Sequence, residues 1–393
     1  MTKLEKLIQE LCPNGVKHCK IKDIYKRVKG TPITAGKMKE IAVDDGEIKI
    51  FAGGKTVITA NESDIPNANI TRVPAVLVQS RGVIDAVYYD KPFTFKNEMW
   101  AYTADDPIKV KFLYYVLKNN IEHFRDAASG MGSLPQISLR VTEEFVVPVP
   151  PLPVQAEIVR ILDNFTELTA ELAAELAARK KQYEYYRDCL YDNNTLMCLS
   201  DCSLSIADGD HMPPPKVEFG VPFITISNIT TRNTISFDNT MFVPQDYYDG
   251  IADKRKAQKG DILYTVVGSF GTPVYIEETV PFAFQRHIAI IRPDTTLLIP
   301  KYLYYAMQTT KFYNQALLKA QGAAQKTISL SSLGKMKIPV PPLAEQERIV
   351  AILDHFDTLC NNISNGLPAE IEGRQKQYEY YRDKLLTFTE VEK

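Results

Sequence analysis

The chain has 393 residues, of which 45% are hydrophobic and 24% are charged, and its formal net charge is −2. This length exceeds one ordinary hydrophobic core and predicts two or three domains. No apolar run approaches the roughly 20 residues of a membrane-spanning helix, and acidic residues interrupt the first ten residues where a signal peptide would be apolar. We therefore expect a cytoplasmic protein. Its six cysteines form no C-x-x-C pair, so we expect neither disulfides nor a zinc site.

Two repeated blocks divide the chain into similar halves. Val149–Asp163 resembles Val340–Asp354, and the sequence KQYEYYRD occupies both Lys181–Asp188 and Lys376–Asp383. The first pair is offset by 191 residues and the second by 195, so the second copy carries four additional residues. A repeat of this kind predicts two copies of one structural unit. We expect globular domains at 1–150 and 196–340, each followed by a long helix, at 151–195 and 341–393.

The charge distribution follows this division. Residues 1–150 carry a net charge of +3 and residues 196–340 carry +2, whereas the helical stretches 151–195 and 341–393 carry −3 and −4. Mildly basic globular domains are compatible with DNA binding, and acidic helices are compatible with protein partners.

The two globular regions share a series of short strands and little else. Val76–Val78 corresponds to Ile262–Tyr264, and Phe93–Asn97 corresponds to Phe282–Arg286. Phe112–Tyr115 and Tyr302–Tyr305 each open a helix, and Ile137–Leu139 matches Ile328–Leu330 after a glycine-rich loop (Ser129–Ser133 in the first copy). These patterns predict an α+β fold with short, mostly antiparallel strands. Shared strands with divergent loops suit two modules that read different targets.

A helix should begin after Pro150–Pro153 and end at Asn193 and Asn194. Its apolar residues recur at alternating steps of three and four, which predicts a coiled-coil seam: Ile158, Ile161, Phe165, Leu168 and Leu172, continued by Tyr183 and Tyr186. The second helix repeats the seam: Ile349, Ile352, Phe356 and Leu359, continued by Tyr378 and Tyr381. Gly366 and Pro368 predict a kink or break within it. The tyrosines and arginines of the KQYEYYRD blocks cover more than one helix face, and both residue types are frequent in interface hot spots, so we also expect partner binding there.

Catalytic motifs are missing. The sequence contains no Walker loop, no GxGxxG before a helix, no HExxH and no GxSxG, so we expect no catalytic residue and no metal ligand. Base and phosphate contacts with DNA require Arg, Lys, Asn, Gln or Ser on loops. The candidates in the first globular region are Lys55, Arg72, Gln79, Ser80, Arg81 and Asn97. Those in the second are Asn228, Arg232, Lys254, Arg255, Lys256, Ser269, Gln285, Arg286 and Lys326.

The duplicated Pro-Pro-Leu…Ile-Leu-Asp block and the duplicated Gln-Tyr-Glu-Tyr-Tyr-Arg-Asp block resemble those of specificity subunits of type I restriction–modification systems. The resemblance covers nearly the whole chain, and it includes Leu162 and Leu353 among the matching helix residues. It implies two tandem α/β target-recognition domains joined by two long antiparallel coiled-coil helices with pseudo-two-fold symmetry.

The resemblance also implies the function. Each recognition domain would read one half of a bipartite, asymmetric site on double-stranded DNA, and the helices would set the spacing and dock two methyltransferase subunits and, through them, restriction subunits. S-adenosylmethionine, ATP and Mg²⁺ are expected on the partners, and no cofactor on this chain. The alternatives are a coiled-coil scaffold without DNA specificity and a stand-alone DNA-modifying enzyme.

Overall fold

The computed structural model describes residues 2–128, 134–192, 195–209, 211, 213–322, 325–361 and 366–391. Its contacts divide the chain into two compact units. Unit 1 comprises Met1–Glu171 and Glu372–Lys393, and unit 2 comprises Leu172–Ile371. The sequence boundaries at 150, 195 and 340 therefore mark repeated modules rather than compact units, because part of each helical stretch belongs to each unit. The predicted helix end at Asn193 and Asn194 and the loop Ser129–Ser133 lie outside the described residues.

Unit 1 contains three small sheets. The four-stranded sheet has the order β2-β8-β5-β6 and the three-stranded sheet the order β4-β3-β7, while β1 pairs with β9. Among the described strands of this unit, the neighbouring strands pair antiparallel except β3 with β7, which are parallel. The strands are β1 (Lys17–Lys20), β2 (Lys26–Val28), β3 (Ile48–Phe51), β4 (Val57–Ala60), β5 (Ala75–Gln79), β6 (Asp85–Tyr89), β7 (Phe93–Phe95), β8 (Trp100–Thr103) and β9 (Val146–Val149).

Unit 2 repeats this topology strand for strand. Its sheets have the orders β11-β17-β14-β15, β13-β12-β16 and β10-β18, and β12 with β16 is again the parallel pair. The strands are β10 (Leu196–Cys198), β11 (Ser203–Asp208), β12 (Val221–Ile224), β13 (Met241–Val243), β14 (Ile262–Thr265), β15 (Pro273–Tyr275), β16 (Ala283–Phe284), β17 (Ile288–Pro293) and β18 (Lys337–Pro339). The predicted α+β class is confirmed, as are the equivalences of β5 with β14 and of β7 with β16.

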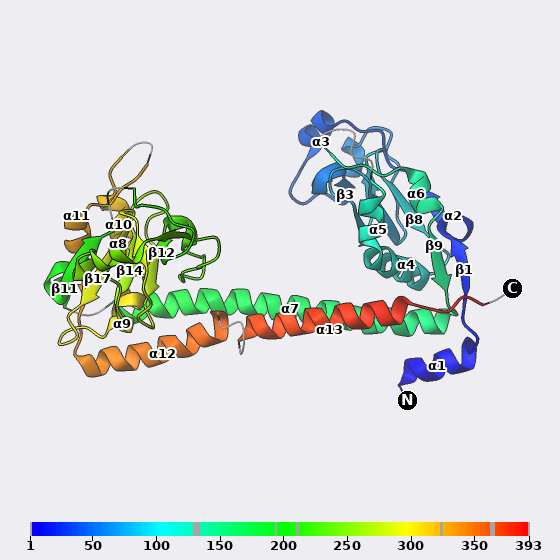
Figure 1. The fold of residues 1–393 in the computed structure, drawn as a ribbon. Helices are drawn as coiled ribbons and strands as arrows, with labels where there is room; N and C mark the ends of the chain where they lie inside the picture. Colours follow the sequence, from blue (N-terminus) through cyan, green and yellow to red (C-terminus); the bar gives the residue numbers. More distant parts are fainter. Residues whose placement is uncertain are drawn as a thin grey trace. The chain divides into compact units, whose positions relative to one another are not determined.

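Helices cover the sheets of each unit. In unit 1, α4 lies between the four-stranded sheet and the long helices, and the short α1 lies at the start of the chain (Figure 1). Thr2 and Glu5 form a capping box that fixes the start of α1. The helices of unit 1 are α1 (Lys3–Leu11), α2 (Ile21–Ile24), α3 (Ala35–Ile41), α4 (Pro107–Asn119), α5 (Ile121–Asp126) and α6 (Leu139–Glu143); those of unit 2 are α8 (Gln245–Asp249), α9 (Pro300–Ala306), α10 (Thr310–Lys319) and α11 (Leu330–Gly334). Single-turn 3₁₀ helices occupy Gly53–Lys55 (η1), Glu62–Asp64 (η2), Leu199–Cys202 (η3), Ile226–Asn228 (η4) and Asp253–Arg255 (η5).

The first long helix is continuous and the second is interrupted. Helix α7 (Leu152–Leu190) passes from unit 1 into unit 2. The second stretch consists of α12 (Leu343–Asn361) and α13 (Leu367–Leu386). Gly366 forms a bend and Pro368 lies in the first turn of α13, a position where proline is tolerated. The predicted interruption at Gly366–Pro368 therefore agrees with a helix that begins anew at Leu367.

Within each unit the two long-helix segments run antiparallel. In unit 1, the Phe165 ring lies 5.6 Å from that of Tyr381 and 6.5 Å from that of Tyr378. In unit 2, the Phe356 ring lies 6.3 Å from that of Tyr183 and 5.9 Å from that of Tyr186. The seam thus pairs the early residues of one repeat with the KQYEYYRD block of the other.

Close packing requires glycine at one pair of equivalent positions in the two units. A Cβ atom on Gly30 would lie 2.1 Å from the carbonyl oxygen of Phe95, and one on Gly209 would lie 2.0 Å from that of Phe284. Gly30 follows β2, and Gly209 follows the equivalent strand β11. The same backbone approach therefore occurs in both copies of the repeat, and no pattern in the sequence indicates it.

Candidate functional site

A buried tyrosine, an aspartate and a lysine join the globular part of unit 1 to α7. The Tyr115 hydroxyl group on α4 donates to Asp163 Oδ1 at 2.5 Å, and Lys111 Nζ lies 2.7 Å from Asp163 Oδ2. The Tyr115 side chain is buried, and this burial, together with the bond to Asp163, raises its pKa well above the usual range. The hydroxyl group therefore stays protonated and remains a donor. We call these three residues the latch of unit 1.

Unit 2 has the same latch. The Tyr305 hydroxyl group on α9 donates to Asp354 Oδ1 at 2.6 Å, and Lys301 Nζ lies 2.8 Å from the same oxygen. Asp163 and Asp354 close the two copies of the repeated Ile-Leu-Asp block. The sequence repeats this aspartate, but only the structure shows its partner on the globular fold.

The start of each repeated block is held by a glutamine. Gln155 donates to the carbonyl oxygen of Pro150 at 2.7 Å, and Gln346 donates to that of Pro341 at 2.8 Å. Both glutamine side chains are buried. These bonds fix the turn from the proline-rich segment into the helix, which explains why the block repeats Gln at this position.

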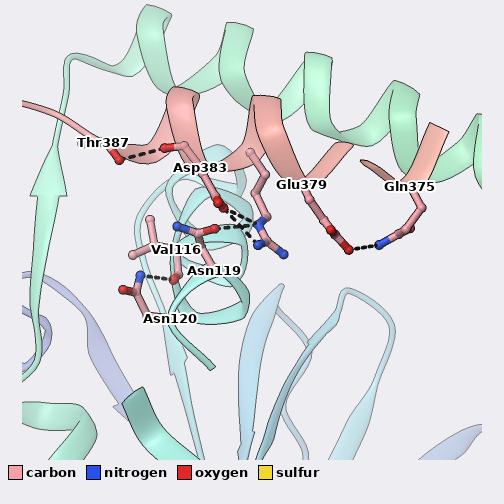
Figure 2. A network of polar contacts seen from close by, with 8 residues as sticks. Val116, Asn119, Asn120, Gln375, Glu379, Asp383 and Thr387 are labelled. Atoms are coloured by element: carbon pink, nitrogen blue, oxygen red, sulfur yellow. Dashed lines mark hydrogen bonds and ion pairs between the residues drawn. The ribbon is translucent and has the colours of Figure 1, made fainter. Parts of the chain in front are cut away.

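The second KQYEYYRD block completes the contact between the globular fold of unit 1 and its long helices. We call this contact, which comprises the latch, Gln155 and this block, the seat of unit 1. Arg382 Nε donates to Asn119 Oδ1 at the end of α4 at 2.6 Å, and its guanidinium group lies 5.6 Å from the Tyr378 ring centre. Figure 2 shows Asn119 facing α13 beside Asp383, which also accepts from Arg382 at 3.0 Å. The block therefore contacts the globular fold directly, in addition to the other helix.

The first KQYEYYRD block plays the corresponding part in unit 2. Asp188 Oδ1 accepts from the backbone N–H of Thr310 at 3.1 Å, at the start of α10. Arg187 lies 5.4 Å from the Tyr183 ring centre, but its buried Nε has no hydrogen-bond partner in the described structure. The seats thus share their residues and differ in which polar atom meets the globular fold.

Burial shows what part of the predicted helix seam contacts. Ile158, Leu162, Ile349, Leu353 and Tyr183 are buried in the cores of their own units, and of these the sequence predicts a contact with a partner subunit only for Tyr183. They bind the globular fold to the helices. Leu172 is also buried, and the remaining seam residues are half-buried: Ile161, Phe165, Leu168, Ile352, Phe356, Leu359 and Tyr378.

Two tyrosine pairs remain exposed. The rings of Tyr185 and Tyr186 lie 5.6 Å apart at 69°, and those of Tyr380 and Tyr381 lie 5.4 Å apart at 74°. Their exposed fractions are 66% and 43% in the first pair and 62% and 42% in the second. Each unit therefore presents the same aromatic surface. Tyr186 and Tyr381 were predicted partner residues, and the ring of each also contacts a seam phenylalanine, Phe356 and Phe165 respectively.

Several predicted DNA contacts gather at one edge of unit 1, which we call rim 1. It is formed by η1, the β5–β6 connection and the β7–β8 connection, which carry Lys55, Arg81 and Asn97 respectively. All three side chains are exposed. A Cβ on Gly82 would lie 3.6 Å from Cα of Gly54, and the N–H of Gly53 donates to Glu98 Oε1 at 3.2 Å. Two loops and a glutamate thus hold these residues side by side.

Rim 2 is the equivalent edge of unit 2. Gly268 N–H donates to the carbonyl oxygen of Lys326 at 3.0 Å, as Gly82 N–H donates to that of Pro135 at 2.9 Å. The neighbouring connection from β16 to β17 carries Gln285 and Arg286. Ser269, Arg286 and Lys326 are exposed and Gln285 is half-buried. These residues stay predictions as DNA contacts.

Three predicted contacts are unsuited to reach DNA. Gln79 and Ser80 are buried, and Ser80 donates to the carbonyl oxygen of Glu98. Asn228 is also buried and accepts from the Thr225 N–H at 2.9 Å. Their burial corrects these assignments: Ser80 and Asn228 use their polar groups inside the fold, and the buried Gln79 side chain does not reach the surface where a base would lie.

The other predicted cations lie outside the chain segments that form the rims. Arg72 precedes β5 and pairs with Glu62, whereas rim 1 follows β5. Lys254, Arg255 and Lys256 precede β14, and Arg255 contacts Asp208 at 3.4 Å. Arg232 lines a cavity of about 920 Å³ beside Tyr304, Lys301 and Asp354. Lys96, Glu98 and His287 also lie at the rims. The sequence does not single them out as DNA contacts; Lys96 lies within an aligned strand segment, and Glu98 and His287 follow the two segments directly.

The described residues contain neither a metal-binding cluster nor a membrane-spanning helix. Within these residues no cluster of three or more His, Cys, Asp or Glu side chains is arranged to hold a metal ion. In the same part of the chain no helix is long and apolar enough to cross a membrane.

Comparison with known proteins assigns the chain to a family. The sequence pattern described as "Type I restriction modification DNA specificity domain" matches residues 13–179 and again residues 214–373. A putative type I restriction enzyme specificity subunit of Haemophilus influenzae is 34% identical over 310 residues, which cover 76% of this chain and 77% of that protein. The specificity subunit of a type I restriction enzyme of Escherichia coli is 31% identical over 370 residues, or 89% of each chain.

Solved structures share the fold. The S subunit of a type I restriction–modification system from M. genitalium is 18% identical, with a TM-score of 0.58 over 98% of this chain and 99% of that chain. A chain from a structural study of the assembly of a type I restriction–modification system is 16% identical, with a TM-score of 0.61 over 96% and 98%. The duplicated pattern and the relatives agree with the two repeated units, and the chain belongs to the type I restriction–modification DNA specificity family.

Proposed function

We propose that this chain is the DNA sequence-specificity subunit of a type I restriction–modification complex. Each unit would read one half of a bipartite site on double-stranded DNA. The observation that carries the proposal is the contrast within the repeat: the seats share their latch and their KQYEYYRD block, whereas the rims carry different side chains. Two recognition units that share one fold but carry different rim side chains suit a DNA site whose two halves differ in sequence.

The long helices would set the spacing between the half-sites and dock the partners. The exposed pairs Tyr185–Tyr186 and Tyr380–Tyr381 have nearly the same exposure and ring geometry. Exposed tyrosines suit interface anchors, because they combine apolar area with a hydroxyl group. Two equal surfaces support docking of two copies of a methyltransferase subunit, with restriction subunits joining through them.

We assign no catalysis and no cofactor to the chain itself. The rims offer cations, amides and hydroxyl groups, which suit phosphate and base contacts. In the proposed complex, S-adenosylmethionine, ATP and Mg²⁺ would be bound by the partner subunits.

The direct test is methylation-site mapping in cells that express this chain with its methyltransferase subunit, compared with cells that lack the chain. The expected result is a new bipartite motif with a fixed unread gap. Replacing residues 196–340 by the corresponding region of another specificity subunit should change one half-site only. An active, assembled complex that methylates without any such motif would overturn the proposal and leave a scaffold.

A further inference from the structure

Rim 1 and rim 2 carry chemically different side chains at two equivalent positions. Rim 1 carries Lys96 and Glu98, two residues apart, and rim 2 carries Gln285 and His287. The backbones of the two segments are held alike. The Lys96 N–H donates to the carbonyl oxygen of Phe51 at 3.0 Å, and the Gln285 N–H donates to that of Ile224 at 3.1 Å. Each segment then turns in the same way: the Met99 N–H donates to the carbonyl oxygen of Lys96 at 3.0 Å, and the Ile288 N–H donates to that of Gln285 at 3.1 Å. The framework is therefore constant and the side chains change.

In rim 1 the pair is ionic. Lys96 Nζ lies 3.0 Å from Glu98 Oε2, and the two side chains are 22% and 29% exposed. The other carboxylate oxygen accepts the N–H of Gly53 at 3.2 Å. A carboxylate has about four acceptor positions, so Glu98 retains acceptor capacity beyond these two bonds.

Glu98 also lines an open cavity. Asn97, Glu98, Gln136, Ser138 and Asn69 share the wall of a space of about 610 Å³ in unit 1. Polar groups that converge on a concave space are typical of a recognition site. A carboxylate next to the exposed cations Lys55 and Arg81 opposes phosphate binding, since both carry negative charge. Its presence is better explained by a contact with an amino group of a base, the contact that Glu makes with cytosine N4.

In rim 2 the pair is neutral. Burial, together with the neighbouring Arg286, lowers the pKa of His287 below its ordinary value, so the imidazole ring is uncharged near pH 7. Gln285 offers an amide, which can both donate and accept, and a neutral imidazole ring can do the same. Rim 2 therefore presents donors and acceptors where rim 1 presents a cation and a pure acceptor.

We propose that Lys96 with Glu98 in unit 1, and Gln285 with His287 in unit 2, are the specificity-determining pairs of the two half-sites. Glu98 would accept from an exocyclic amino group in the major groove, with Lys96 positioning its carboxylate group. The inference rests on the proposed function and names the residues through which each unit distinguishes bases.

The test is an exchange of the pairs in the full chain, in complex with its methyltransferase subunits. The variant K96Q/E98H should change the preferred base in one half-site, with roughly ten-fold or greater discrimination at the affected position, and leave the other half-site unchanged. The reciprocal variant Q285K/H287E should change the other half-site. Methylation-site mapping in cells reads both halves at once.

Two further variants separate specificity from folding. Glu98→Gln retains an acceptor for the Gly53 N–H but adds a donor, so it should alter the base preference of a folded complex. The matched control D105H/K109Q removes another ion pair of unit 1 (2.9 Å), which follows the opposite end of β8, and should leave the motif unchanged.

The outcomes are distinguishable. If the wild-type chain gives no bipartite motif, the proposed function itself fails. If it gives a motif that both exchange variants and Glu98→Gln keep with unchanged preference at every base, only the present inference fails. A uniform loss of methylation by a folded Glu98→Gln complex, with the motif unchanged, would also overturn it, because that result indicates a purely structural role.

Discussion

The two units share the residues of their seats but differ in the residues of their rims. At the seats, Tyr115, Lys111 and Asp163 recur as Tyr305, Lys301 and Asp354, with contact distances that agree within about 0.1 Å. At the rims, Lys96 and Glu98 are replaced by Gln285 and His287 on the same backbone. Seat residues are the same in both units because a substitution there would leave buried polar groups without hydrogen-bond partners. Rim residues vary because exposed loop side chains contribute little to folding.

A second difference separates the seats themselves. In unit 1, α1 covers the beginning of α7, where Val154 is fully buried and Glu157 pairs with Lys3 at 2.8 Å. At the equivalent positions of unit 2, Glu345 and Arg348 pair with each other at 2.7 Å and are partly exposed. The described residues of unit 2 contain no counterpart of α1. The covered position is therefore apolar in unit 1 (Val154), and the equivalent position is charged in unit 2 (Glu345), where it is partly exposed.

The largest expected effect comes from the two packed glycines. Gly30→Ala should destabilise unit 1, and Gly209→Ala unit 2, by about 3 kcal/mol or more, because each Cβ would overlap a backbone carbonyl oxygen that cannot move independently. Hydrogen exchange measured peptide by peptide should show the loss in one unit only. Gly36→Ala is the control, since its Cβ would meet nothing within 4 Å. Equal loss in both units would contradict the independence of the two packing contacts.

The latch should contribute equally in both units. Asp163→Ala leaves the buried Tyr115 hydroxyl group without its acceptor, at a cost of about 2 kcal/mol, and Asp354→Ala should cost the same. A double-mutant cycle with Tyr115→Phe, repeated with Tyr305→Phe, measures the coupling in the free energy of unfolding. Coupling energies that differ by more than about 1 kcal/mol would show that the seats are not equivalent.

The rims should differ from other surfaces in their dependence on salt. Lys55→Ala in rim 1 and Arg286→Ala in rim 2 should each weaken DNA binding several-fold and reduce the slope of log affinity against log salt by about one. Titrations of the assembled complex at several salt concentrations give this slope. Lys109→Ala, away from the rim, is the control. If both variants leave this slope unchanged, Lys55 and Arg286 do not contact DNA phosphates and the DNA does not pass over the rims.

The smallest expected effect concerns acid. Hydrogen bonds from Arg160 and then Lys3 lower the pKa of Glu157 from 4.5 to about 2. A carboxyl group with a depressed pKa in the folded state stabilises the fold above its unfolded pKa and loses this contribution as the pH falls. Unit 1 should therefore lose about 1 kcal/mol between pH 5 and pH 2 through this group.

Glu157→Gln should remove that part of the pH dependence and cost a similar amount at pH 7. Unit 2 has Arg348 at this position, so its stability offers an internal comparison in the same experiment. If the acid profile of unit 1 is unchanged in Glu157→Gln, the ion pairs with Lys3 and Arg160 do not contribute to folding in solution.

Much of the fold follows from patterns that the sequence displays openly. The repeat at Lys181–Asp188 and Lys376–Asp383 predicts two units. Periodic apolar residues predict the long helices, and Gly366 and Pro368 predict the interruption of the second one. Strand equivalences such as Val76–Val78 with Ile262–Tyr264 are recoverable because buried strands need apolar residues at fixed steps. These features depend on local chemistry or on repetition.

The seat and the burial of rim residues are not recoverable in this way. Nothing local shows that Asp163 meets Tyr115 or that Arg382 meets Asn119, because each pair joins distant segments. Serine is a residue type that is common in exposed loops, yet the Ser80 hydroxyl group donates to a carbonyl oxygen inside the fold. Ile158 lies at the spacing expected of a helix–helix contact. This spacing alone does not show whether the residue packs against another helix or against the globular fold, where it is found.

The pairing of the C-terminal segment with the start of β1 has a consequence for synthesis. Val16 N–H donates to the carbonyl oxygen of Thr389 at 2.9 Å, and Val391 N–H donates to that of Val16 at 3.1 Å. Unit 1 therefore needs residues that the ribosome makes after the whole of unit 2, whose residues are Leu172–Ile371. At about 5–20 residues per second, this interval lasts roughly 10–40 s. The unit that begins first is completed last, and its unfinished helix face is open to chaperones or to a waiting partner during that time.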